Sequence, residues 1–329
     1  MILSHVITRR VAARSLIAVA KDEESGSGPY FLATLDPVSG RPYNNSLWVN
    51  ASTRAAGVLP AACAVYSNNA SLVATLVSVS SIGWALPTVD MTTGTMVGNP
   101  WRYGPAFVPS NLQLLAMPAN GKHPPTDASI LLDSYNLTVA RHEIYTVDTA
   151  TGDRTLLRLL DTSLKIRSGV SAFRSNTSSP EGQQLFLVAN SDDLESDSVL
   201  VVVDVRGGGG NGGNGDHANV DDENINGVAV VPLDVYPTAI AWDGATSSVL
   251  AVVGSRPTCL VSLNYTAKEA HAAAPPHSRA ALETPGSVSA GEDAIACVED
   301  AYGAYGSTPA VVDDDTRTLY AALLTTQSP

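Results

Sequence analysis

The chain has 329 residues, of which 44% are hydrophobic and 16% charged, and its 19 basic and 32 acidic side chains give a formal net charge of −13. This apolar fraction excludes wholesale disorder, and no run of about 18 apolar residues indicates a membrane span. A pI near 4.7 argues against nucleic acid or an anionic lipid surface as the main partner, because both bind basic faces.

The N-terminal stretch is basic and contains no acidic side chain before Asp22. Organellar transit peptides share this composition, whereas the unbroken hydrophobic region of a secretory signal is missing. An ordinary edge strand or linker is the alternative interpretation. We therefore leave residues 1–14 open as a targeting or flexible segment of a single domain that spans residues 1–329.

An apolar strand followed by an Asp or Asn turn recurs along the chain. The units are FLATLDPVSG (31–40), ALPTVDMTTG (85–94), IYTVDTATG (144–152), VLVVVDVRGG (199–208) and CLVSLNYTA (259–267). Their markers follow one another at intervals of 54, 58, 56 and 60 residues and are Asp36, Asp90, Asp148, Asp204 and Asn264. β-Branched and aromatic residues favour strands, and a side chain that accepts from the backbone two residues on favours a turn. Each unit therefore predicts a hairpin.

A second hairpin precedes most of these units. It reads as a short apolar strand, a polar turn and another apolar strand, at residues 62–79, 171–190, 239–254 and 310–324. Two hairpins per period give four strands in about 57 residues, which is too long for a solenoid turn and lacks the amphipathic helix of a βαβ unit. Four antiparallel strands per repeat, arranged radially, form the blade of a β-propeller.

The segments AIAWDGATSSVLAVV and IYTVDTATGDRTLL resemble the blades of NHL, YVTN-type and quinoprotein-like propellers, and the resemblance covers about residues 14–326. It implies a fold and no particular activity, because such blades occur in enzymes, lectins, receptors and scaffolds. We predict an all-β propeller of four-stranded antiparallel blades, with about five to six blades.

Ring closure has two interpretations. The hairpin at 310–324 could complete a blade with the strands at 30–49 and close a five-bladed ring, which we favour because closure leaves no unpaired edge. The alternative is an incomplete ring, a fragment of six to eight blades.

Residues 206–227 form a Gly- and Asn-rich insertion between the third and fourth strands of the fourth unit, and their composition predicts a disordered surface loop. Within it, Asp222, Asn224 and Asn226 alternate and are followed by Gly227, as in the first half of a calcium-binding loop. The twelfth position is Leu233 instead of a bidentate Glu. An acidic loop without a ligand is therefore the favoured interpretation and a calcium site the alternative; no other cofactor is predicted.

The chain has three cysteines, Cys63, Cys259 and Cys297, and their spacing matches neither a metal-binding pair nor a redox pair. An oxidising compartment would allow a disulfide between Cys259 and Cys297. Six sequons offer glycosylation candidates, at Asn44, Asn50, Asn69, Asn136, Asn176 and Asn264. These features favour an extracellular or secretory location, with an organelle as the alternative.

Recognisable catalytic motifs are missing: the sequence has no nucleophile elbow and no paired metal-ligating histidines. We therefore favour a non-enzymatic interaction or structural module that binds a protein or a glycan through its loops; the oligomeric state is left open. The alternative is an enzyme of the lactonase, hydrolase or quinoprotein type with its site in the central channel. Inner-strand candidates for that site are Asp243, Asp313 and Arg174.

Overall fold

The computed structural model is built of β-strands and turns in the residues that it describes. These are residues 2–10, 14–21, 30–35, 47–48, 57–68, 71–80, 83–90, 93, 95–115, 129–149, 151–175, 183–191, 198–205, 227–244, 246–254, 258–263, 296–298, 301–302, 310–313, 318–321 and 324–325, with side chains mainly between 83 and 263. Within these ranges no helix has the length and apolar character needed to cross a membrane.

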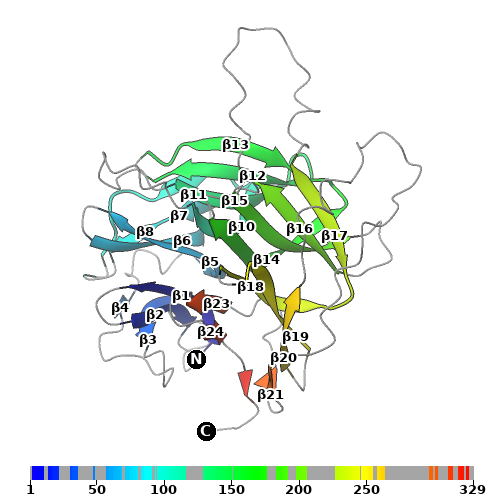
Figure 1. Ribbon diagram of the computed structural model, residues 1–329. Helices are drawn as coiled ribbons and strands as arrows, with labels where there is room; N and C mark the ends of the chain where they lie inside the picture. The colour runs from blue at the N-terminus through cyan, green and yellow to red at the C-terminus, as the bar shows by residue number, and fades with distance from the viewer. Residues whose placement is uncertain are drawn as a thin grey trace, which may run out of the picture.

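Five antiparallel sheets, A to E, follow one another along the chain (Figure 1). Sheet A contains β1 (Ile2–Arg10), β2 (Arg14–Lys21), β3 (Tyr30–Leu35) and β4 (Leu47–Trp48). Sheet B contains β5 (Gly57–Asn68), β6 (Ser71–Ser80), β7 (Gly83–Leu86) and β9 (Trp101–Tyr103), with β8 (Thr88–Asp90) also paired to β6.

The other three sheets each have four strands in sequential order. Sheet C contains β10 (Phe107–Leu115), β11 (Ser129–Asn136), β12 (Arg141–Asp148) and β13 (Arg154–Leu159). Sheet D contains β14 (Leu164–Ser175), β15 (Gln183–Ser191), β16 (Ser198–Asp204) and β17 (Val228–Leu233). Sheet E contains β18 (Pro237–Asp243), β19 (Ser248–Val253), β20 (Thr258–Leu263) and β21 (Ala296–Val298).

The first strand of each sheet lies beside the first strand of the next, so that β1, β5, β10, β14 and β18 form an inner series. The sheets themselves are separate ladders, which excludes a single flat layer. Sequential four-stranded antiparallel sheets joined through their inner strands are the architecture of a β-propeller, and the predicted fold class is confirmed.

The ring is not closed by a further four-stranded sheet among the described residues. Two short ladders occupy this region, β23 (Ala310–Asp313) with β24 (Thr318–Ala321) and β22 (Ala301–Tyr302) with β25 (Leu324–Thr325). β23 contacts both β18 and β1, and Figure 1 shows it between sheets E and A.

The closure that we favoured from the sequence is wrong. β3 and β4 do not pair with the hairpin at 310–324; β3 pairs with β2, and β4 pairs with β3. The reason lies in β1, which the sequence left open as a targeting or flexible segment. β1 occupies the other edge of β2 and supplies the inner strand that we expected from the C-terminal hairpin.

The apolar cores lie between neighbouring sheets. One cluster joins sheets B and C, a second joins C and D, and a third joins D and E. In the third cluster the rings of Phe186 and Trp242 stack with centroids 5.4 Å apart. Val199 to Val203 are all buried because both faces of β16 are covered, which explains the unbroken apolar run of this strand.

The recurring Asp turn has the same geometry in sheets B and C. Oδ1 of Asp90 accepts the N–H of Thr93, and Oδ1 of Asp148 accepts the N–H of Thr151, each at 3.0 Å. The acceptor reaches three residues on, one more than the sequence predicted, because these turns are longer than two residues. Gly152 closes the second turn with φ of 77°.

The insertion begins after β16 and ends before β17, between the third and fourth strands of sheet D as predicted. Val203 pairs with Val228, and the N–H of Asp204 donates to the carbonyl of Gly227 at 2.7 Å. The two ends of the insertion are therefore joined by the ladder, and residues 206–226 lie outside the described residues.

Candidate functional site

One end of the propeller gathers the turns that surround the starts of the inner strands. Phe107, the first residue of β10, pairs with Asn136 at the β11–β12 turn, and Leu164, the first residue of β14, pairs with Ser191 at the end of β15. We call this end the turn face and define it by residues 104–106, 137–140, 161–163 and 234–236. It is the candidate site because its inner strands carry a chain of polar side chains.

The chain of polar side chains begins between β10 and β14. The Nδ2 amide of Asn111 donates to Oδ2 of Asp133 at 2.8 Å and to the carbonyl of Arg167 at 3.2 Å, while its Oδ1 accepts the N–H of Gly169 at 2.8 Å. Ser168 donates to the carbonyl of Ser110 at 3.0 Å. Irregular pairing in both inner strands, at Pro109/Asn111 and Ile166/Ser171, turns these groups toward one another.

The buried carboxylate of Asp133 also contacts His142. The Oδ1–Nδ1 distance is 2.9 Å, and the two side chains are 0% and 6% exposed. The ring of Tyr135 packs against the imidazole with centroids 5.0 Å apart. Both oxygens of Asp133 are therefore occupied by partners within sheet C.

Ser134 follows Asp133 but does not complete a nucleophilic triad. Successive residues of a strand point to opposite faces of the sheet, so Ser134 lies on the face away from Asp133 and His142. The hydroxyl of Ser134 is buried and makes no hydrogen bond among the described residues. The Ser, His and Asp present in these two strands are thus not assembled for acyl transfer.

Arg167 continues the polar chain from sheet D to sheet E. Its Nε and Nη2 donate to Oδ1 of Asn190 at 2.9 and 2.6 Å, Nη2 donates to Ser198 at 3.2 Å, and Nη1 donates to the carbonyl of Pro237 at 2.9 Å. Its guanidinium lies 3.5 Å from the ring centroid of Tyr236. Burial lowers the pKa of Arg167, and the four hydrogen bonds offset part of that cost.

A second arginine–aromatic cluster lies between sheets B and C. The guanidinium of Arg154 lies 4.0 Å from the ring centroid of Phe107, 4.4 Å from that of Tyr103 and 5.2 Å from that of Tyr145. Tyr145 donates to Glu143, which also accepts from Asn136 at 3.1 Å. Burial is the main cause that raises the pKa of Tyr103 and of Tyr145 to about 12.

Two of the inner-strand candidates lie at the opposite end of these strands. Arg174 is buried near the end of β14, with Nη1 3.4 Å from Oε1 of Gln184 and its guanidinium 5.0 Å from the ring centroid of Trp242. Asp243 is buried at the end of β18 and accepts from Thr246 at 2.5 Å. Asp313 is the last residue of β23, and its side chain lies outside those described.

The predicted calcium ligands Asp222, Asn224 and Asn226 lie outside the described residues, so this site stays a prediction. In the part of the chain with described side chains, no group of three His, Cys, Asp or Glu residues could hold a metal. Of the six sequons, only Asn136 is described; Asn44, Asn50, Asn69, Asn176 and Asn264 are not. Asn136 lies at the β11–β12 turn, where its Oδ1 accepts the N–H of Thr138 at 3.0 Å.

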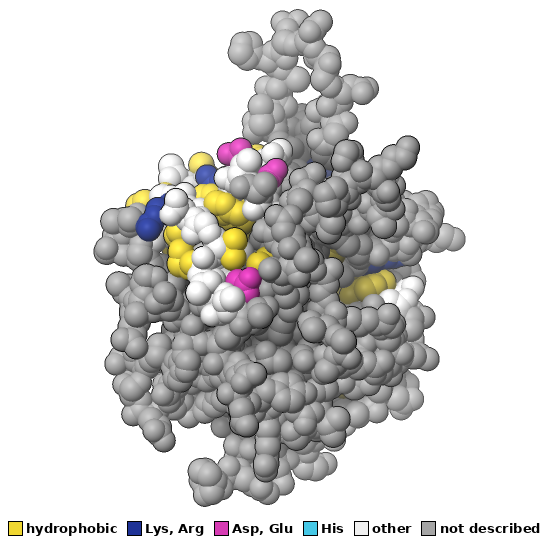
Figure 2. Space-filling model, turned by 90° about the vertical axis from the view of Figure 1, so that its left-hand side faces the viewer, with side chains coloured by type: hydrophobic (Ala, Val, Ile, Leu, Met, Phe, Trp, Pro, Cys, Tyr) yellow, Lys and Arg dark blue, Asp and Glu magenta, His cyan; other side chains and the backbone are white. Residues whose placement is uncertain are grey.

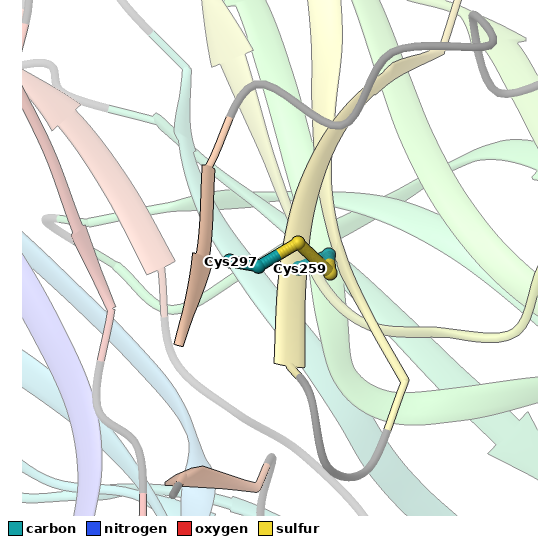
Figure 3. Close-up of a disulfide and its surroundings, with 2 residues drawn as sticks. All are labelled: Cys259 and Cys297. Carbon is teal, nitrogen blue, oxygen red and sulfur yellow. A yellow bond between two sulfur atoms is a disulfide. The ribbon is translucent and has the colours of Figure 1, made fainter. Parts of the chain in front are cut away.

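Cys259 and Cys297 form a disulfide in the structure (Figure 3). They lie directly opposite each other in the antiparallel pair β20–β21, with Cα atoms 4.1 Å apart. The bond fixes the outermost strand of sheet E, which makes few ladder pairs of its own. It also joins residues separated by 38 positions.

Comparisons with known proteins give structural resemblances only. No protein-family profile and no curated protein matches the sequence. The exo-β-1,3-galactanase of Phanerochaete chrysosporium is 11% identical over 82% of this chain, with a TM-score of 0.48. The Dos1 propeller is 9% identical over 81%, with a TM-score of 0.40, and Hsv2 of Kluyveromyces lactis is 10% identical over 97%, with a TM-score of 0.36.

The chain spans 62% of the galactanase chain, 59% of the Dos1 propeller chain and 84% of the Hsv2 chain. Identities and TM-scores this low carry no inference about activity. The assignment to the β-propeller fold therefore rests on the strand order and on the contacts between inner strands described above.

Sequence reasoning missed the residues of the polar chain. Asn111, Asp133 and His142 lie on three strands of sheet C. Arg167 lies in sheet D and Tyr236 in the turn between sheets D and E, so no linear motif contains them. The hairpin β10–β11 was absent from the predicted repeats because residues 116–128 separate its strands. Polar residues at the repeat interval of 58 do pair in the structure, namely Ser110 with Ser168 and Gln113 with Ser171, and this is the signal that could have located the inner strands.

Proposed function

We propose that the chain is a non-enzymatic binding module that contacts a protein or a glycan through the turn face. The main support is that three charged groups near this face, Asp133, Glu143 and Arg167, are each engaged by neighbouring groups of the protein. Asp133 holds His142 and Asn111, Glu143 holds Tyr145 and Asn136, and Arg167 holds three partners. A general acid or base needs an open side toward a substrate, whereas Asp133 and Glu143 bind partners within sheet C and Arg167 joins sheet D to sheet E.

The exposed parts of the turn face suit an interaction surface. Leu137 and Tyr236 are each 56% exposed and Val139 is 44% exposed. Rigid strands hold these side chains on short turns, the arrangement in which propellers and other scaffolds present binding residues. On the side of the molecule shown in Figure 2, described hydrophobic side chains gather with a few basic and acidic groups near them.

The compartment that we propose is extracellular or secretory. A disulfide between Cys259 and Cys297 supports an oxidising environment, because such bonds are rare in the cytosol. The net charge of −13 supports a partner that is not itself strongly acidic.

Affinity capture and substrate assays on the purified protein test this proposal together. The protein is immobilised and exposed to a library of secreted proteins and to a glycan array, and in parallel is incubated with chromogenic lactone, ester and glycoside substrates. We expect saturable capture that weakens when Leu137 and Val139 are replaced by Ser, and no turnover. Turnover that is abolished by Asp133→Asn would contradict the proposal and favour the enzyme alternative.

A further inference from the structure

The exposed ring of Tyr236 has an unusual support. Its face lies 3.5 Å from the guanidinium of Arg167, which donates hydrogen bonds to Asn190, Ser198 and the carbonyl of Pro237. These partners come from β15, β16 and β18, so the guanidinium is fixed from two sheets. An aromatic ring that packs on a fixed cation loses little side-chain freedom when a ligand covers its other face.

An arginine also packs on aromatic rings in the cluster between sheets B and C, but there the rings are buried and the arginine is exposed. There Tyr103 and Phe107 are 8% and 7% exposed and the exposed Arg154 covers them. At the turn face the arginine is inside and the ring is outside, at 56% exposure. The cluster around Arg154 is closed by its own cation, whereas the contact at the turn face leaves the ring of Tyr236 exposed to solvent.

The phenol of Tyr236 has spare hydrogen-bonding capacity. Its hydroxyl has no hydrogen-bond partner among the described residues. Asn190 accepts from Arg167 through Oδ1 and so helps to fix the guanidinium behind the ring. A phenol can both donate and accept a hydrogen bond.

The chemistry of the site selects a neutral ligand with one apolar face. A second cation over the free face of Tyr236 would meet the field of the half-buried Arg167, and an anionic partner would meet the net charge of −13. A pyranose packs its C–H face on an aromatic ring while its hydroxyls bond to amides and phenols. A protein hot spot, by contrast, lies within a desolvated apolar patch, and Asp234 beside this ring is exposed.

We propose that Tyr236, supported by Arg167, is a binding subsite for a neutral pyranoside. This rests on the proposed function and narrows it from a protein or glycan partner to a saccharide at one place. Tyr236 supplies the stacking face and, through its phenol, a hydrogen bond, and Arg167 keeps the ring in place. Binding of a single sugar unit is expected to be weak, with a millimolar Kd.

Saturation-transfer NMR on the intact chain tests the subsite with methyl β-galactoside, methyl β-glucoside and methyl α-mannoside as probes. We expect transfer to the ring protons of at least one probe, a loss of about tenfold in Tyr236→Ala because the stacking face is removed, and a smaller loss in Tyr236→Phe, which keeps the face and removes only the phenol hydroxyl. Leu137→Ala is the matched control, since Leu137 has the same 56% exposure on the same face. Each variant is first compared with the wild type by thermal unfolding.

Two outcomes would overturn the subsite. One is saccharide binding that persists unchanged in a folded Tyr236→Ala variant, and the other is the absence of transfer to all three probes. If the protein then still captures a partner protein, the proposed binding function stands without this subsite. If it captures nothing and turns over a substrate, the proposed function fails as well.

Discussion

Asn111 accepts the backbone N–H of Gly169 at 2.8 Å, across the boundary between two sheets and 58 positions along the chain. The same interval separates Ser110 from Ser168 and Gln113 from Ser171, which are also hydrogen bonded. It equals the spacing between the markers Asp90 and Asp148. The repeat visible in the sequence is therefore expressed as side-by-side packing of inner strands that run in the same direction.

Replacing Asn111 by Ala should weaken the joint between sheets C and D. The change leaves Asp133 Oδ2, the Gly169 N–H and the Arg167 carbonyl without this partner in a buried site, and we expect a loss of about 2–3 kcal/mol of unfolding free energy. Gln113→Ala is the control, because the side chain is only half buried, and should cost about 1 kcal/mol or less. Equal midpoints for both variants in urea would contradict this role of Asn111.

Gly152→Ala should destabilise the β12–β13 turn through a collision with sheet B. A Cβ at this position would lie 2.1 Å from Cδ1 of the Trp101 indole, and the backbone has φ of 77°. Gly98 has φ of 67° and open space around a Cβ, so Gly98→Ala carries the backbone strain alone, about 1–2 kcal/mol.

Gly152→Ala should lower the free energy of unfolding by more than Gly98→Ala does, and the difference measures the contact with Trp101. Adding Trp101→Ala should recover that difference, and a double-mutant cycle by chemical denaturation measures the coupling. Purely additive effects would show that Trp101 does not cover this turn.

Opening the Cys259–Cys297 bond should lower stability without abolishing the other sheets. For residues separated by 38 positions the loop-entropy account gives about 4 kcal/mol, lost in the double variant Cys259→Ser/Cys297→Ser. Thermal unfolding with and without a reducing agent checks this, and the double variant should not respond to the reductant. A wild-type melting temperature insensitive to reduction would argue against the bond in solution.

Stability should fall at alkaline pH through Tyr103 and Tyr145. Burial raises the pKa of each from 10.0 to about 12, so their neutral forms favour the folded state. This contribution is complete below pH 10 and is lost as the pH rises from 10 through about 12. Spectrophotometric titration of tyrosinate should show two late-titrating phenols, and Tyr145→Phe should remove one of them.

The strand pattern could be predicted because it is local. The marker turns at Asp90 and Asp148 identified sheets B and C, and the run at 199–203 identified a buried strand. The pairing of β1 with β2 could not be predicted, because the edge at which a strand pairs depends on contacts distant in sequence. The polar chain at the turn face was equally hidden, since Asn111, Arg167 and Tyr236 come from sheet C, sheet D and the turn before sheet E and meet only when these parts pack together.

The packing of inner strands can be measured directly as an amide-to-amide nuclear Overhauser effect in the perdeuterated chain. The account predicts a cross-peak between the backbone amide proton of Gly169 and the side-chain amide protons of Asn111. It also predicts that no ladder cross-peaks join the backbones of β10 and β14, which belong to separate sheets. Regular interstrand cross-peaks between β10 and β14, with none from the Asn111 side chain, would place both strands in one continuous sheet and contradict the propeller.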